Sequence, residues 1–151
     1  MDVHVRTIGP MSDDAKRVKT SHTELSLEQI AELLPGTSEL MQSVGTAWWK
    51  CAYAARGGNW QLAAYFARRV RGLQHKLSIV RPKYAEDLEA FEGEHLAPVL
   101  AACEARDGAS FDRAYNAAVD KANALHVKWG KSYIRWVLPD EAPTDLDLGP
   151  E

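Results

Sequence analysis

The sequence has few of the features that mark several classes of protein. It contains no apolar run of about 18 residues, so no membrane-spanning helix is expected. Its two cysteines, Cys51 and Cys103, are too few for a disulfide scaffold and too far apart for a Cys-x-x-Cys motif. The net charge of −3 argues against non-specific binding of nucleic acid. What remains is one soluble domain, because 151 residues can bury a core without disulfides or metals.

The first 25 residues also lack the apolar stretch of a secretory signal, because charged residues interrupt every short hydrophobic run. We therefore expect a cytoplasmic protein in which both cysteines are reduced and buried. Residues 12–25 are polar and of mixed charge. They predict an N-terminal arm over residues 1–25 that is either disordered or ordered against a partner.

No segment alternates between apolar and polar residues as a strand does, whereas helical spacing recurs along the chain. Ser26 and Gln29 have the form of a capping box for a short leading helix that ends at Pro35-Gly36. Pro98 is expected to bend a later helix, because it removes the hydrogen bond to the Glu94 carbonyl. Four longer helices are predicted: Thr37 or Ser38 to Gly57, Asn59 to Pro82, Tyr84 to Ala105, and Ser110 to Gly130. Asn59 and Ser110 are the expected N-caps of the second and the fourth of them.

The loops between these helices are short, which places sequential helices antiparallel. We therefore predict an all-α fold, an up-down-up-down antiparallel four-helix bundle with a short leading helix and extended termini. The expected organisation is an arm over 1–25, a single helical-bundle domain over 26–139, and an acidic C-terminal tail over 140–151 that lies on the surface or on a partner.

The charges form two blocks along the chain. Residues 56–83 carry seven basic side chains and no acidic one, and residues 84–107 carry seven acidic side chains and one arginine. If the helices of these two blocks lie side by side, ion pairs between them explain both. A nucleic-acid or phosphate site on the basic block is the alternative.

The last predicted helix carries His126 on its apolar stripe, four residues after Ala122 and three before Trp129. A buried imidazole needs partners for both ring nitrogens. His126 is therefore either a core histidine bonded to a neighbouring polar group, or a contact for a bound molecule or for iron.

Residues 58–65 (GNWQLAAY) and 123–126 (NALH), followed by 133–135 (YIR) and Pro139, resemble an uncharacterised group of bacterial four-helix proteins related to cytochrome c′. Proteins of the cytochrome c′ type attach haem through Cys-x-x-Cys-His, and the histidine is the axial ligand. The matching residues in this chain are 122–126, where Ala122 and Leu125 stand in place of the cysteines. The resemblance thus implies a bundle without covalent haem at residues 122–126 that keeps the histidine, and no resident cofactor. Non-covalent haem held by His126 is a lesser alternative.

A bundle shaped around haem and deprived of it either collapses or keeps a flat apolar slot that admits a planar molecule. Plain core packing of the aromatic residues is the alternative to such a slot. The candidate ligand-binding residues are His126, Trp129, Trp48, Phe66 and Leu125, with Tyr53, Tyr65 and Tyr115 as hydroxyl partners.

The leading hypothesis is a non-catalytic binding or accessory protein that holds a small aromatic ligand in its core or serves a partner protein. The first alternative is a structural subunit of a larger complex, or a homo-oligomer formed through the termini, with a fully packed core. Its contacts would include Tyr133, Arg135 and Trp136, which have the composition of an interface hot spot. A small enzyme that uses His126 is the weaker alternative. A di-iron site is not expected, because the Glu-x-x-His of residues 92–95 has no second copy.

Overall fold

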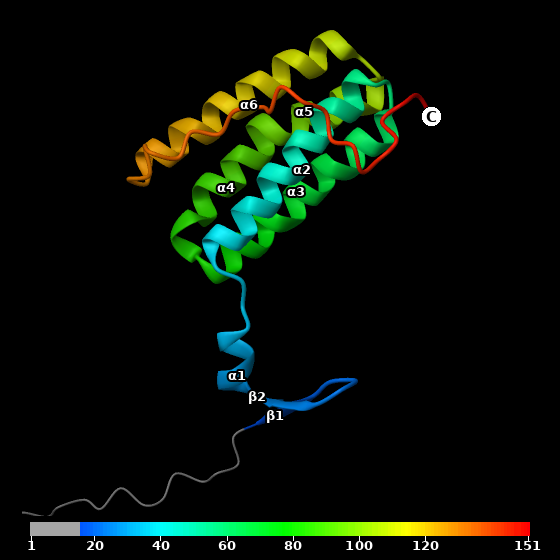
Figure 1. Cartoon of the computed structure of the whole chain (residues 1–151). Helices are drawn as coiled ribbons and strands as arrows, with labels where there is room; N and C mark the ends of the chain where they lie inside the picture. The colour runs from blue at the N-terminus through cyan, green and yellow to red at the C-terminus, as the bar shows by residue number, and fades with distance from the viewer. Residues whose placement is uncertain (1–15) are drawn as a thin grey trace, which may run out of the picture. The chain divides into compact units, whose positions relative to one another are not determined.

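The computed structural model describes residues 16–151 and is mainly helical (Figure 1). The chain divides into two compact units, with the boundary between Pro35 and Gly36. In this division the short leading helix belongs to the N-terminal unit, and residues 140–151 belong to the second unit. None of the described helices is long and apolar enough to cross a membrane.

The N-terminal unit contains a small antiparallel sheet that the sequence did not predict. Strand β1 (Arg17–Lys19) pairs with β2 (Glu24–Ser26), and Val18 lies opposite Leu25. Each strand has only three residues, which are too few to show an alternating pattern in the sequence. Hydrogen bonds within the connecting turn support the pairing. There the Thr20 hydroxyl oxygen accepts from the backbone N–H groups of His22 and Thr23. The rest of the predicted arm, residues 1–15, lies outside the described residues.

Helix α1 (Leu27–Glu32) follows directly and confirms the predicted capping box. The Gln29 N–H donates to the Ser26 hydroxyl at 3.1 Å, and the Gln29 side chain accepts from the Ser26 N–H at 2.9 Å. Leu33 and Leu34, which follow this helix, are exposed.

Two long helices open the second unit, α2 (Thr37–Arg56) and α3 (Trp60–Val80). Helix α2 begins at Thr37, as expected, and its cap is Gly36, whose N–H donates to the Glu39 carboxylate. Asn59 caps α3 as predicted, accepting from the Leu62 N–H at 3.1 Å. Between the helices Gly58 has φ +81°, a conformation that glycine adopts without strain.

The third predicted helix is broken into segments. A 3₁₀ turn (Pro82–Tyr84) leads into α4 (Ala85–Phe91), a π-helical turn η2 (Glu92–Leu96) and α5 (Ala97–Ala105). In the π turn the Ala97 N–H donates to Glu92 O, five residues back. The irregularity lies next to Pro98, where a bend was expected, because proline has no N–H with which to continue the regular ladder.

Helix α6 (Gly108–Lys128) completes the helical set. Its cap is Asp107 and not Ser110: the Asp107 carboxylate accepts from the Ser110 N–H at 3.1 Å and from the Ser110 hydroxyl at 2.6 Å. The chain leaves the helix through Gly130, as expected, with φ +72°.

Within this unit α2 packs along α3, α3 along α4 and α5, α5 along α6, and α6 contacts α2 (Figure 1). Helices α2 and α3 can approach each other closely because small side chains are buried in both of them. These fully buried residues are Cys51, Ala54, Ala63 and Ala67. Both cysteines are buried free thiols, as predicted. The neighbouring Cys103 thiol and burial raise the pKa of Cys51, and the neighbouring Cys51 thiol lowers the pKa of Cys103.

The two charge blocks are paired less than expected. Between α3 and the π turn the described residues form one ion pair, Arg71 with Glu92 at 4.0 Å. Asp87 of the acidic block instead pairs with Lys128 of α6 at 2.7 Å. The prediction fails because most basic side chains of α3 point to solvent.

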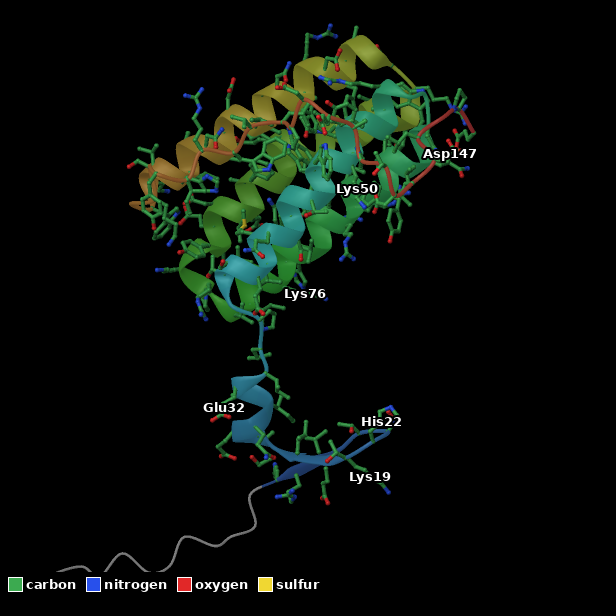
Figure 2. All side chains as sticks on the ribbon, viewed as in Figure 1. Lys19, His22, Glu32, Lys50, Lys76 and Asp147 are labelled. Atoms are coloured by element: carbon green, nitrogen blue, oxygen red, sulfur yellow. The ribbon has the colours of Figure 1, made fainter. Side chains whose placement is uncertain are left out.

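The residues after α6 run back over the helices toward the α3 start (Figure 1). The Tyr53 hydroxyl donates to the carbonyls of Pro139 and Asp140 at 2.7 and 2.8 Å, and the Trp49 indole donates to Glu141 O at 2.9 Å. Lys50, labelled in Figure 2, pairs with Asp145 and holds the pKa of that carboxyl below its usual value. The acidic tail therefore lies on its own helical unit.

Candidate functional site

The second unit contains a cavity of about 1020 Å³. It lies between the first half of α2, the second half of α3, the C-terminal end of α6 and residues 131–139, which form one wall. Tyr84 and Phe91 close it on the side of α4. The aromatic and apolar lining includes Trp48, Val44, Val70, Leu77, Leu125, Trp129 and Trp136. This concave, mainly apolar space is the kind of site that takes a small molecule.

A stacked pair of aromatic rings makes one wall rigid. Trp48 stacks on Tyr115 with ring centroids 4.6 Å apart and planes 13° from parallel. The Tyr115 hydroxyl donates to the Trp48 carbonyl at 2.7 Å, so both residues are fixed at two points. Burial raises the pKa of Tyr115. Trp48 thus presents a flat, preformed surface to the cavity.

A second tryptophan is fixed at the α4 side. The Trp129 indole N–H donates to the Asp87 carboxylate at 2.8 Å, and the ring meets Tyr84 edge to face at 4.8 Å. Hydrogen bonds from Lys128 and Trp129 hold the pKa of Asp87 below its usual value. The polar edge of Trp129 is therefore paired, which leaves its apolar surface for the cavity.

His126 also lines the cavity, and one of its ring nitrogens has a defined role. Nδ1 lies 3.0 Å from the Ile134 carbonyl oxygen. Because a carbonyl oxygen can only accept, Nδ1 carries a proton in this contact. The residue is half-buried, as are Ala122 and Leu125, which line the same space.

Gln74 is a cavity residue that the sequence reasoning missed. It projects from α3, is 8% exposed, and its Oε1 has no hydrogen-bond partner among the described residues. The signal was present in the sequence, since Gln74 stands four residues after Val70 and three before Leu77 on the apolar stripe of the helix. A polar residue at such a position needs a partner.

Four of the predicted ligand-binding residues come together at the cavity: Trp48, Leu125, His126 and Trp129. The other four lie elsewhere. Phe66 borders a separate groove of about 520 Å³ between α2 and α3. Tyr53 holds the C-terminal segment, Tyr115 supports Trp48 from behind, and Tyr65 is 55% exposed. Helical spacing placed Leu125, His126 and Trp129 on one face of α6, and Trp48 on the apolar face of α2. It could not tell which tyrosines turn inward.

The three predicted interface residues, Tyr133, Arg135 and Trp136, all line the cavity. Tyr133 is 80% exposed, whereas Trp136 is half-buried and packs over Gly45. A Cβ at Gly45 would lie 3.0 Å from the Trp136 indole nitrogen, so a larger residue there would press on the Trp136 ring.

Comparisons of the chain with protein families, curated proteins and solved structures find no match. Among the described residues no group of three or more His, Cys, Asp or Glu side chains is arranged to hold a metal ion. The cavity offers flat apolar walls, a buried carboxamide and an imidazole. This arrangement suits binding of a planar molecule with polar groups at its edges.

Proposed function

We propose that the Gly36–Glu151 unit is a non-catalytic binding protein that holds a small planar aromatic ligand in its cavity. The observation that carries the proposal is the unpartnered Oε1 of Gln74, in a side chain that lines this mainly apolar space. A buried acceptor without a partner costs about 1–3 kcal/mol. A ligand N–H or O–H group that bonds to Gln74 removes this cost.

The preformed walls support the same proposal. Trp48 is fixed by its stack on Tyr115, and Trp129 by its hydrogen bond to Asp87. Rings held in this way lose little conformational freedom when a ligand enters, and offset stacking of aromatic rings adds about 0.5–1.5 kcal/mol per pair. A planar aromatic molecule gains more from such walls than a branched aliphatic one.

We further propose that this unit is an up-down-up-down antiparallel four-helix bundle of the cytochrome c′ type. The packing of each helix on its sequence neighbour, closed by the contact of α6 with α2, supports that arrangement. Ala122, Leu125 and His126, which correspond to the haem-attaching motif, all line the cavity. Neither Ala122 nor Leu125 has a sulfur for a thioether bond, so the proposal is a haem-free bundle.

The test is native mass spectrometry of freshly purified protein, followed by titration with 2-naphthalenemethanol monitored through the indole N–H signals in NMR. Ala122→Phe fills the cavity from α6, and Ala124→Phe adds the same ring at an exposed position of that helix. We expect binding to the parent chain and to Ala124→Phe, and none to a folded Ala122→Phe. Equal binding to both variants contradicts the proposal. A Soret band that vanishes in His126→Ala would show non-covalent haem instead.

A second candidate function, a subunit of a larger complex, is favoured by exposed apolar residues near the end of α6. Val127, Tyr133 and Val137 are 61%, 80% and 65% exposed. Exposed aromatic and branched side chains of this kind are typical of an interface. Sedimentation equilibrium tests this candidate: a monomer at every concentration and salt level rules out self-association, and a dimer that Tyr133→Ser dissociates supports it.

A further inference from the structure

The cavity has a positively charged rim that its apolar walls do not explain. Lys131 and Arg135 both line it, on either side of a tight turn in which the Ile134 N–H donates to the Lys131 carbonyl at 2.8 Å. Neither side chain forms an ion pair with any residue that the structure describes. No Asp or Glu of the described chain lines the cavity.

Two further lysines lie near Trp129, which lines the cavity. Lys83 lies over the rings of Tyr84 and Trp129, at 5.0 and 5.8 Å, and Lys128 lies 5.7 Å from the Trp129 ring. Asp87 lies at the same end and is already bound by Lys128 and the Trp129 indole. A chain with a net charge of −3 therefore presents an excess of positive charge at this cavity.

We propose that the ligand is a planar aromatic carboxylate, whose acid group is bound at the rim by Arg135 and Lys131 while its ring lies between the tryptophan walls. This inference rests on the proposed function and adds the charge of the ligand to it. A guanidinium matches the two oxygens of a carboxylate with parallel hydrogen bonds, and an ammonium adds a second charge-assisted bond.

The segment that carries Lys131 and Arg135 is held at the cavity, which supports a specific role for these two cations. Gly130, with φ +72°, turns the chain so that residues 131–139 lie along α6. The Lys131 N–H donates to the His126 carbonyl at 2.7 Å, and His126 Nδ1 pairs with Ile134 O. The segment that carries both cations is thus held in place by hydrogen bonds to one residue of the cavity wall.

The experiment compares two ligands of nearly equal shape, 2-naphthoate and the neutral 2-naphthalenemethanol, by calorimetry on the full chain. We expect 2-naphthoate to bind roughly tenfold tighter at low salt, and this advantage to shrink as salt screens the exposed cations. Arg135→Gln and Lys131→Gln each weaken 2-naphthoate about three- to tenfold and leave the alcohol unchanged. The matched control is Lys76→Gln, an exposed α3 cation outside the cavity lining (Figure 2), which changes neither affinity.

The outcomes separate the two proposals. If the alcohol binds as tightly as 2-naphthoate, or if Arg135→Gln and Lys131→Gln act no differently from Lys76→Gln, the carboxylate assignment is overturned and the aromatic binding function stands. If neither ligand binds, both proposals fail. A preference for 2-naphthoate that both rim substitutions remove and that Lys76→Gln keeps supports the assignment.

Discussion

The side chain of Asn123 pairs with the backbone of Trp136 in both directions. Its Nδ2 donates to Trp136 O at 3.0 Å, and its Oδ1 accepts from the Trp136 N–H at 2.8 Å. The Asn123 carboxamide therefore forms with the Trp136 backbone the pair of hydrogen bonds that a neighbouring strand would form in a sheet. The residues that form the outer wall of the cavity are thereby fixed to α6.

Replacing Asn123 with alanine should loosen this wall. Two hydrogen bonds are lost and the half-buried Trp136 backbone is left unpaired, so we expect a loss of about 1–3 kcal/mol of unfolding free energy. Hydrogen exchange of the Trp136 N–H should accelerate more than that of the α2 and α3 core. Asn116→Ala is the control, since Asn116 is an exposed residue of the same helix. Equal effects of the two substitutions would contradict the pairing.

Gly57→Ala should detach the end of the C-terminal segment. A Cβ at this position would lie 1.9 Å from the Leu148 carbonyl oxygen, although the backbone of Gly57 is compatible with alanine. We expect faster proteolysis of residues 140–151 and a lower melting temperature. Gly72→Ala in α3, where a Cβ meets nothing within 4 Å, should instead stabilise by about 0.5–1 kcal/mol. A stabilising Gly57→Ala would be incompatible with the observed contact.

Gln74→Leu should affect stability and binding in opposite directions. The leucine replaces a buried, unpartnered carboxamide, so the ligand-free protein should gain about 1–2 kcal/mol in chemical denaturation. The affinity for 6-hydroxy-2-naphthoate, whose hydroxyl can donate to Gln74, should fall relative to that for 2-naphthoate. If stability drops instead, Gln74 has a partner that its geometry does not show.

Acid should release the contact of Trp129 with Asp87. Hydrogen bonds from Lys128 and Trp129 lower the pKa of Asp87 in the folded protein, so the folded state binds the proton less readily than the unfolded state. The stabilisation is present above the unfolded pKa and is lost as pH falls through the lowered folded pKa. We expect the Trp129 indole signal to shift in this acid range, and Asp87→Asn to remove that titration. Asp120→Asn, at an exposed position of α6, should leave it in place.

The sequence alone was sufficient for the helices and several of their ends. Ser26, Asn59 and Gly130 act locally, through a cap or a positive φ, and each has the role that its neighbours in the chain predict. The cap of α6 was misplaced by three residues, because Asp107 and Ser110 are both good caps and their competition is settled by geometry. The two-stranded sheet was missed because its strands are too short to carry a pattern.

The candidate site shows the same difference between features that local sequence predicts and features that tertiary packing decides. The periodicity of α6 placed His126, Leu125 and Trp129 on one face, since residues three and four apart on a helix share a face whatever packs against it. The partners across the cavity depend on which helices meet and how the chain returns after Gly130. Only the tertiary structure brought Gln74 and the Lys131–Pro139 wall to that face, because contacts between distant segments are set by packing and not by local spacing.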